Sequence, residues 1–191
     1  MLNHSLGKDR SFKLITLLGL SGSGKSTVGQ HLAKSMRLKF IDTDKLIEES
    51  EKKSIQEIFQ ENGELYFRQQ EESVLTKVCQ DYEHRFSILA VGAGLPFFNK
   101  NQEKLIRSGY LVYLRTRIET LIKRLDTDAI AKRPLLSKGD GNSIYSILKK
   151  QLDERVSFYE NVDVIIDTDD KSVSDLSFEI GRYYLSEAIW C

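Results

Sequence analysis

The sequence has no excess of charge of either sign and very little cysteine. Its 191 residues include 28 Lys and Arg and 28 Asp and Glu, so the net charge is zero. A nucleic-acid-binding surface requires a concentrated basic excess, so the composition argues against that class of partner. The two cysteines, Cys79 and Cys191, have the spacing of neither a zinc site nor a disulfide framework. We expect both to be free thiols in a reducing compartment.

Long apolar segments are also missing. The longest mainly apolar run, residues 14–20, is far too short to cross a bilayer. Residues 1–11 are polar and lack the apolar core of a signal peptide, so we interpret them as a flexible N-terminal tail. These absences predict a cytoplasmic protein without a membrane partner, which we expect to be a monomer.

What the sequence does contain is an alternation of short apolar segments and amphipathic ones, without repeats. The apolar segments are rich in aliphatic or aromatic residues and mostly flanked by Gly, Asp or Ser, which is typical of buried strands. We predict strands at residues 14–18, 40–41, 88–91, 110–114 and 164–166. We predict helices at residues 25–36, 44–51, 63–82, 99–107, 118–125, 143–159 and 172–185, and one more that begins at the capping-box spacing of Ser54 and Glu57.

This alternation predicts a single α/β domain over residues 12–191, with a short five-stranded parallel sheet between two layers of helices. Ligands of such sheets bind at the carboxyl ends of the strands. Four candidate functional segments begin just after predicted strand ends, at Gly19, Asp42, Gly92 and Arg115. We therefore expect them to meet at one edge of the sheet.

Residues 126–142 differ in composition from the rest of the chain. They contain three Asp, two Lys, two Gly, Arg133 and Pro134, with few apolar residues. We interpret this segment as a lid that closes over the site. The composition is equally compatible with a plain surface connection.

The clearest motif is the segment GLSGSGKS at residues 19–26, which matches the P-loop pattern G-x-x-x-x-G-K-[ST] in full. Its glycines let backbone N–H groups point inward at phosphate oxygens, and the following helix adds its positive N-terminal end. In such a loop the lysine reaches the β- and γ-phosphates and the next hydroxyl ligates Mg²⁺. The motif follows an apolar strand and precedes an amphipathic helix, so it predicts a three-layer P-loop NTPase fold. The predicted ATP-binding residues are Gly22, Ser23, Gly24, Lys25, Ser26 and Thr27.

Two carboxylates follow the second predicted strand, at Asp42 and Asp44. A Mg²⁺–phosphate site needs a carboxylate near the metal, often through water, and Asp42 suits that role. A hydroxyl acceptor needs a carboxylate that orients it and accepts its proton, and Asp44 suits that role. Asp44 could instead cap the next helix. The nearby P-loop favours the functional interpretation, and both roles can coexist.

Two arginines on predicted helices could bind a carboxylate. Arg68 has Glu71 and Glu72 at i+3 and i+4, where they could fix its guanidinium. Arg155 lies one turn before Tyr159. Arginine binds a carboxylate through a bidentate fork, so convergence of the two would indicate an acceptor that carries a carboxylate. From the residues alone, solvated surface charges are the simpler interpretation of both.

Three further features have weaker signals. The turn at residues 92–94 could offer backbone N–H groups to a ligand, although an ordinary turn fits the pattern as well. Arg133 suits the transferred phosphate, as an arginine finger supplied within the chain. His31, one turn beyond the P-loop, we interpret as a surface or packing residue.

Taken together, these motifs resemble the shikimate kinase family. The matches keep the family's order over about residues 12–170, and they are GLSGSGKST at 19–27, DTD at 42–44, FRQQE at 67–71, GAG at 92–94, RPLL at 133–136 and RVSFY at 155–159. A P-loop is shared by many families, whereas the combination of DTD, FRxxE and RPLL is far more specific. The resemblance implies a kinase of the nucleoside-monophosphate-kinase type that uses ATP and Mg²⁺. Its product from shikimate would be shikimate 3-phosphate, an aromatic amino-acid precursor.

The resemblance also implies roles on the nucleotide side of the site. Lys25 and Ser26 would bind ATP and Mg²⁺, and Asp42 would assist the metal through water. Arg133 would close over the γ-phosphate, and Arg124 would stack on the adenine.

On the acceptor side, the resemblance implies that Asp44 holds the shikimate hydroxyls and orients the attacking one. Arg68 and Arg155 would clamp the shikimate carboxylate. Backbone contacts would come from Gly92, Ala93 and Gly94.

One departure from the family concerns the acceptor. The family has three glycines where this chain has Gly92-Ala93-Gly94, and Val91 replaces a usual threonine. Alanine keeps the N–H but disfavours a positive φ, so a positive φ at Ala93 would rearrange the turn, whereas a negative φ would change little.

Two alternatives stay open. The acceptor could be a different small hydroxy acid or a nucleotide, or the chain could be a non-catalytic ATP-binding sensor. The intact set of Lys25, Asp42, Asp44 and Arg133 argues against a sensor.

Overall fold

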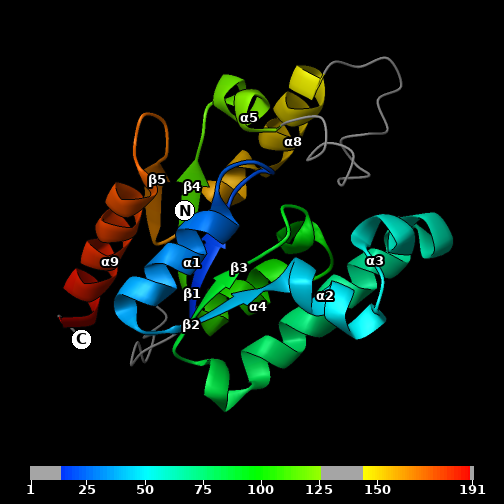
Figure 1. Ribbon diagram of the computed structural model, residues 1–191, viewed down its shortest axis with the longest axis horizontal. Coiled ribbons are helices and arrows are strands. Elements are labelled where there is room, and N and C mark those ends of the chain that lie inside the picture. The colour runs from blue at the N-terminus through cyan, green and yellow to red at the C-terminus, as the bar shows by residue number, and fades with distance from the viewer. Residues whose placement is uncertain (1–13, 126–143, 190–191) are drawn as a thin grey trace.

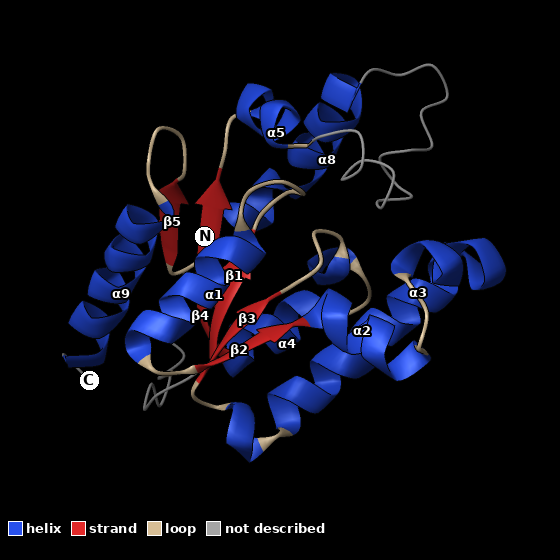
Figure 2. Ribbon diagram, viewed as in Figure 1, coloured by secondary structure: helices blue, strands red, loops and turns tan. Residues whose placement is uncertain are grey.

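The computed structural model describes residues 14–125 and 144–189. The predicted tail at residues 1–11, the predicted lid at 126–142 with Arg133, and Cys191 lie outside the described residues. Figure 1 shows the arrangement of the elements, and Figure 2 separates the strands from the helices by colour.

A five-stranded parallel sheet lies at the centre, with the strand order β2-β3-β1-β4-β5. β1 pairs in parallel with β3 and with β4, so the P-loop that follows it begins in the middle of the sheet edge. The sheet confirms the predicted fold class. The strands are β1 (Leu14–Leu18), β2 (Lys39–Asp42), β3 (Ser87–Ala90), β4 (Gly109–Arg115) and β5 (Val164–Asp167).

Helices cover both faces of this sheet. α1 and α9 pack together on one face, while α3, α4 and α8 cover the other (Figure 1). The described helices are α1 (Lys25–Met36), α2 (Thr43–Glu51), α3 (Ile55–Gln80), α4 (Asn101–Ser108), α5 (Ile118–Arg124), α8 (Ile144–Tyr159) and α9 (Val173–Ile189), with short 3₁₀ turns η1 (Tyr82–His84) and η2 (Leu95–Phe97). Within the described ranges, no helix is both long and apolar enough to span a membrane.

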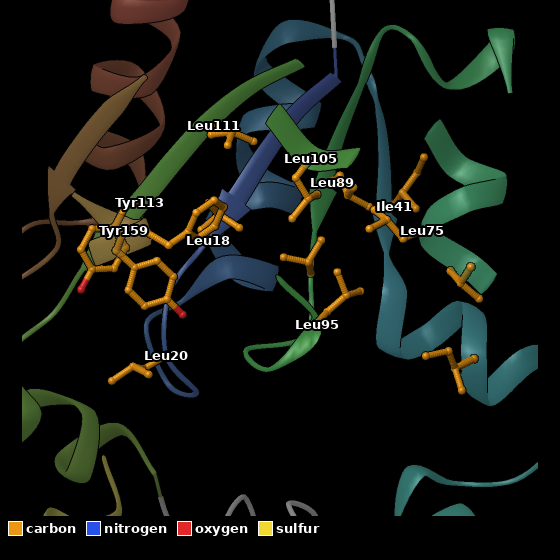
Figure 3. Packing of buried hydrophobic residues seen from close by; sticks show 14 of the residues in the cluster. Leu18, Leu20, Ile41, Leu75, Leu89, Leu95, Leu105, Leu111, Tyr113 and Tyr159 are labelled. Atoms are coloured by element: carbon orange, nitrogen blue, oxygen red, sulfur yellow. The ribbon is translucent and has the colours of Figure 1, made fainter. Parts of the chain in front are cut away.

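Alternate residues of the strands supply two separate cores. Leu18 belongs to the core beneath α3, α4 and α8, whereas Leu17 belongs to the core beneath α1 and α9. Successive side chains of a strand point to opposite faces, which explains this division. Figure 3 shows the first core, where Leu18 lies beside Tyr113 and Tyr159. The three central strands β1, β3 and β4 are almost wholly buried, as is typical of parallel sheets, whereas the edge strands β2 and β5 are partly exposed.

Three comparisons of the helix boundaries with the prediction have a clear local explanation. α2 begins at Thr43, and its N-cap is Asp42, whose Oδ1 accepts a hydrogen bond from the Asp44 N–H at 3.1 Å. The alternative in which Asp44 caps this helix was therefore wrong. α3 is interrupted at Gly63, whose φ of 79° and ψ of 176° are not helical, so two helices meet there at a kink, at the position where the second helix was predicted to begin. α4 begins at Asn101, since Asn99 has a left-handed φ of 48°.

Candidate active site

The P-loop forms a tight curve between β1 and α1. Gly22 and Gly24 have φ values of 86° and 95°, in the left-handed region that favours glycine. Gly24 is also the N-cap of α1, and as a glycine it has no side chain that could occupy the first N–H groups of the helix. The first N–H groups of α1 and the positive end of its dipole therefore face the loop, as an anion site requires.

Lys25 folds back over this curve. Its Nζ donates to the carbonyl oxygens of Gly19 at 2.9 Å and Leu20 at 3.0 Å. The ammonium group is thus held above the cradle by backbone dipoles. A phosphate bound in the loop would meet a positive charge already in place.

Asp42 joins the P-loop to the second strand. Ser26 Oγ donates to Asp42 Oδ2 at 2.7 Å, while the other carboxylate oxygen caps α2. Between the two aspartates, Thr43 Oγ1 accepts the N–H of Gly92 at 3.0 Å. The ends of β1, β2 and β3 are therefore tied together by side chains, as the prediction of a shared edge requires.

Glycine at position 92 is needed for space. A Cβ at Gly92 would clash with Glu71 Oε1 and lie 2.9 Å from Asp44 Oδ1. The carboxylates of α2 and α3 therefore press against the backbone of the turn. Gly94 is restricted in the same way, because a Cβ there would lie 2.5 Å from Nη1 of Arg68.

Arg68 is fixed on α3 by two carboxylates. It donates to Glu71 Oε2 at 2.6 Å and to Glu64 Oε1 at 3.1 Å. Burial acts to lower the pKa of Arg68, but the two acids outweigh burial and raise it. The expected partnership with Glu72 was wrong, because Glu72 instead binds Lys104 and Asn99.

Glu71 is an unusual carboxylate because it is almost fully buried, with 1% of its surface exposed. Burial raises its pKa to about 7, although the Arg68 guanidinium opposes this effect. The nearby carboxylates of Asp44 and Glu64 raise the pKa further. Glu71 therefore titrates near neutral pH inside the site.

Arg155 reaches the same turn from α8. Its Nη1 donates to the Ala93 carbonyl at 3.1 Å, and its guanidinium lies 5.1 Å from the ring centre of Phe97. Burial is the main cause that lowers the pKa of Arg155, and the positive charge of Arg68 adds to it. The two guanidinium groups thus approach neighbouring residues of one turn, from helices far apart in the sequence.

The backbone conformation at Ala93 decides whether this residue strains the turn. Among the described residues other than glycine, a positive φ occurs only at Arg37, Lys52, Asn99 and Asp170, so Ala93 has a conformation that alanine adopts without strain. The glycine lost from the family pattern is therefore not one that this turn needs for its φ.

Arg124 is the last residue of α5 and lines the same pocket as the P-loop. It donates from Nη1 to Thr168 Oγ1 at 3.2 Å and from Nη2 to the Thr168 carbonyl at 3.1 Å, which joins α5 to the segment after β5. Thr168 was missed in the sequence, because no local motif links it to Arg124.

A pocket of about 380 Å³ opens between these groups. Its lining combines the P-loop, both aspartates, the turn after β3 and Arg124, so segments from four parts of the sequence share one cavity. The lining residues are Ser21, Gly22, Gly24, Lys25, Ser26, Thr27, Asp42, Asp44, Ala90, Val91, Gly92, Ala93, Arg124 and Leu125.

Other residues singled out in the sequence lie elsewhere. His31 contacts Ser177 of α9, with 3.0 Å between Nδ1 and Oγ, in agreement with a packing role. Cys79 is a free thiol on α3. Glu64 was missed as a partner of Arg68, although its position at i−4 is a signal that the sequence offered. Phe97 was also missed.

The fold and the site define a P-loop kinase: a phosphate cradle and an acidic acceptor region share one edge of a parallel sheet. The family model described as shikimate kinase matches residues 21–184 of this chain. The chain belongs to the shikimate kinase family. It is therefore a phosphotransferase that uses ATP as co-substrate and an alcohol group as acceptor.

Individual relatives agree with this assignment. A shikimate kinase of Clostridium botulinum (strain ATCC 19397 / Type A) is 40% identical over 152 residues, which cover 80% of this chain and 85% of the relative. A shikimate kinase of Caldanaerobacter subterraneus subsp. tengcongensis is 34% identical over 173 residues, 91% of this chain and 96% of the relative. The solved structure of shikimate kinase from Acinetobacter baumannii in complex with shikimate is similar with a TM-score of 0.83. It is 32% identical and the match covers 93% of this chain and 96% of that one.

Proposed function

We propose that this protein transfers the γ-phosphate of ATP to a hydroxyl of shikimate and forms shikimate 3-phosphate. The observation that carries the proposal is the position of Arg68 and Arg155 at one turn, residues 92–94, of which Gly92 and Ala93 line the same pocket as the P-loop. Two guanidinium groups beside a phosphate cradle suit an acceptor that carries both a carboxylate and a hydroxyl.

On the nucleotide side, we assign phosphate binding to the loop from Gly22 to Thr27, which includes Lys25. Ser26 and Asp42 would hold Mg²⁺, Asp42 through water. Within the described residues no group of three or more His, Cys, Asp or Glu side chains could hold a metal ion. Ser26 Oγ donates to Asp42 Oδ2 at 2.7 Å, so the hydroxyl and the carboxylate that would hold the metal lie side by side. Mg²⁺ usually binds few protein ligands and keeps several waters and the substrate phosphates. When bound, the metal neutralises charge that develops on the phosphate oxygens.

On the acceptor side, Asp44 orients the attacking hydroxyl and accepts its proton. Arg68 and Arg155 bind the carboxylate, and the backbone of Gly92, Ala93 and Gly94 completes the contacts. Catalysis in this arrangement depends mainly on positioning and on charge stabilisation.

Further parts of the proposal rest on the sequence. Arg133 stabilises the transferred phosphate and Arg124 stacks on adenine. Residues 12–191 form one kinase domain in which residues 126–142 act as the lid. The protein works in the cytoplasm as a monomer and binds neither nucleic acid nor membrane.

A coupled ADP-release assay with and without shikimate tests the proposal. We expect ADP release to depend on shikimate, and to be far slower with gluconate or with nucleoside monophosphates. The control is Lys25→Ala, which should retain its circular dichroism spectrum and lose turnover. Turnover of another acceptor with none of shikimate would overturn the acceptor assignment, and ATP binding without any turnover would favour a sensor.

A further inference from the structure

The two arginines of the proposed acceptor site are held in different ways. Arg68 is paired with two acids, Glu64 and Glu71, which offset its positive charge. Arg155 makes no ion pair with a carboxylate in the described part of the chain, and its contacts there are the Ala93 carbonyl, the Tyr159 hydroxyl and the ring of Phe97. The positive charge that remains for an acceptor therefore belongs mainly to Arg155.

Phe97, which supplies that ring, is itself firmly placed. It ends the 3₁₀ turn η2 directly after Gly94, and its N–H donates to the Gly94 carbonyl at 3.0 Å. The preceding Leu95 is fully buried, and its carbonyl accepts a hydrogen bond from the buried side chain of Asn101 at 2.9 Å. Two hydrogen bonds thus anchor the backbone that leads to Phe97.

The Phe97 ring is also supported by a series of aromatic rings that leads back to the sheet. It makes edge-on contacts with Phe158 at 5.8 Å and with Tyr159 at 5.6 Å between ring centres. Tyr159 in turn stacks on Tyr113 of β4, at 4.4 Å and an angle of 9°. Aromatic rings that pack in this way lose their freedom to move, so Phe97 presents a fixed face to Arg155.

We propose that Phe97 is a positioning residue for the acceptor carboxylate, which acts by holding the Arg155 guanidinium beside the turn at 92–94 without neutralising it. This inference rests on the proposed function. A carboxylate in place of the ring would fix the guanidinium but would also cancel its charge. An aromatic face attracts the cation through its quadrupole and leaves the net charge available for the ligand.

The experiment compares Phe97→Leu, which removes the ring, with Phe97→Tyr, which restores an aromatic face. We expect Phe97→Leu to raise the KM for shikimate about threefold to tenfold, with kcat and the KM for ATP changed less than about twofold. Phe97→Tyr should return the KM to within about twofold of the wild-type value. The matched control is Phe178→Leu, since Phe178 is exposed on α9 and its ring is outside the site.

Two further arms separate positioning from a general effect on packing. In an Arg155→Ala background, Phe97→Leu should add nothing to the KM for shikimate. The side-chain Nε–H signal of Arg155 in ¹⁵N spectra should be rigid in the wild type and in Phe97→Tyr, and mobile in Phe97→Leu. This spectrum needs no acceptor, so it tests the role of Phe97 even if shikimate is not turned over.

The proposal is overturned if Phe97→Leu leaves the Arg155 signal unchanged. It is also overturned if the same substitution raises the KM for ATP as much as that for shikimate, or raises the KM for shikimate equally without Arg155. Failure of the proposed function would give a different result, namely a wild-type protein that does not turn over shikimate.

Discussion

Replacement of the buried Glu71 by glutamine should make this protein more stable at alkaline pH, even though it removes an ion pair. Glu71 contacts Arg68 at 2.6 Å, and Glu71→Gln keeps the shape of the side chain while it removes the charge. The usual expectation for a broken ion pair is a loss of stability. Here the cost of burying the carboxylate exceeds the attraction of Arg68, because the pKa of Glu71 is raised and not lowered.

The size of the effect follows from the difference between the folded and unfolded pKa values. Burial raises the pKa of Glu71 from 4.5 to about 7. Between these values the folded protein binds more protons at this site than the unfolded chain, so stability falls as the pH rises through that window. The ionised carboxylate then costs up to about 3 kcal/mol above pH 7, a cost that the glutamine variant does not have.

Urea unfolding of both proteins at pH 5 and pH 8 measures this cost. We compare the unfolding free energy of Glu71→Gln with that of the wild type at each pH. From pH 5 to pH 8 this difference should change by about 2 to 3 kcal/mol in favour of the variant. The control is Glu64→Gln, which removes the other acid beside Arg68 from a half-exposed position and should show little pH dependence. A Glu71→Gln variant that is less stable than the wild type at pH 8 would refute the reasoning, since the ion pair would then outweigh burial.

Three other predictions concern neighbouring parts of the site. Arg68→Ala and Arg155→Ala should raise the KM for shikimate far more than the KM for ATP. Equal effects on the two KM values would refute the assignment of these arginines to the acceptor carboxylate. Asp42→Ala should lower the unfolding free energy by about 1 kcal/mol through the lost cap of α2 and should raise the Mg²⁺ concentration for half-maximal rate. An unchanged Mg²⁺ requirement would exclude Asp42 from the metal site. Gly92→Ala should cost about 1 to 3 kcal/mol in urea unfolding, because its Cβ clashes with Glu71, and full stability would show that the carboxylate moves freely.

Local patterns predicted those parts of the protein that depend on neighbours in sequence. The P-loop at residues 19–26 and the capping box of Ser54 and Glu57 both involve residues within a few positions of each other, and the structure confirms the helix start at Ser54. Helix boundaries were less well predicted where more than one side chain could act as the cap. At the start of α2, for example, Asp42 is the N-cap in place of Asp44.

Contacts between distant segments could not be predicted in the same way. Arg155 and Ala93 are 62 residues apart in the sequence, and Arg124 and Thr168 are 44 apart, so no periodicity relates them. Glu64 and Glu72 are equally near Arg68 in the sequence, and only Glu64 contacts it. Glu72 is instead bound by Asn99 and Lys104, which are 27 and 32 residues away and so could not be read from local spacing.

The sequence by itself determined the class of chemistry, because a phosphate cradle is built from consecutive backbone N–H groups and needs only the right local residues. The tertiary structure alone decided which charges remain for a ligand: it buried Glu71 beside Arg68 and left Arg155 against the ring of Phe97. Burial and the distances between charges set electrostatic energies, and both exist only after the helices have packed on the sheet.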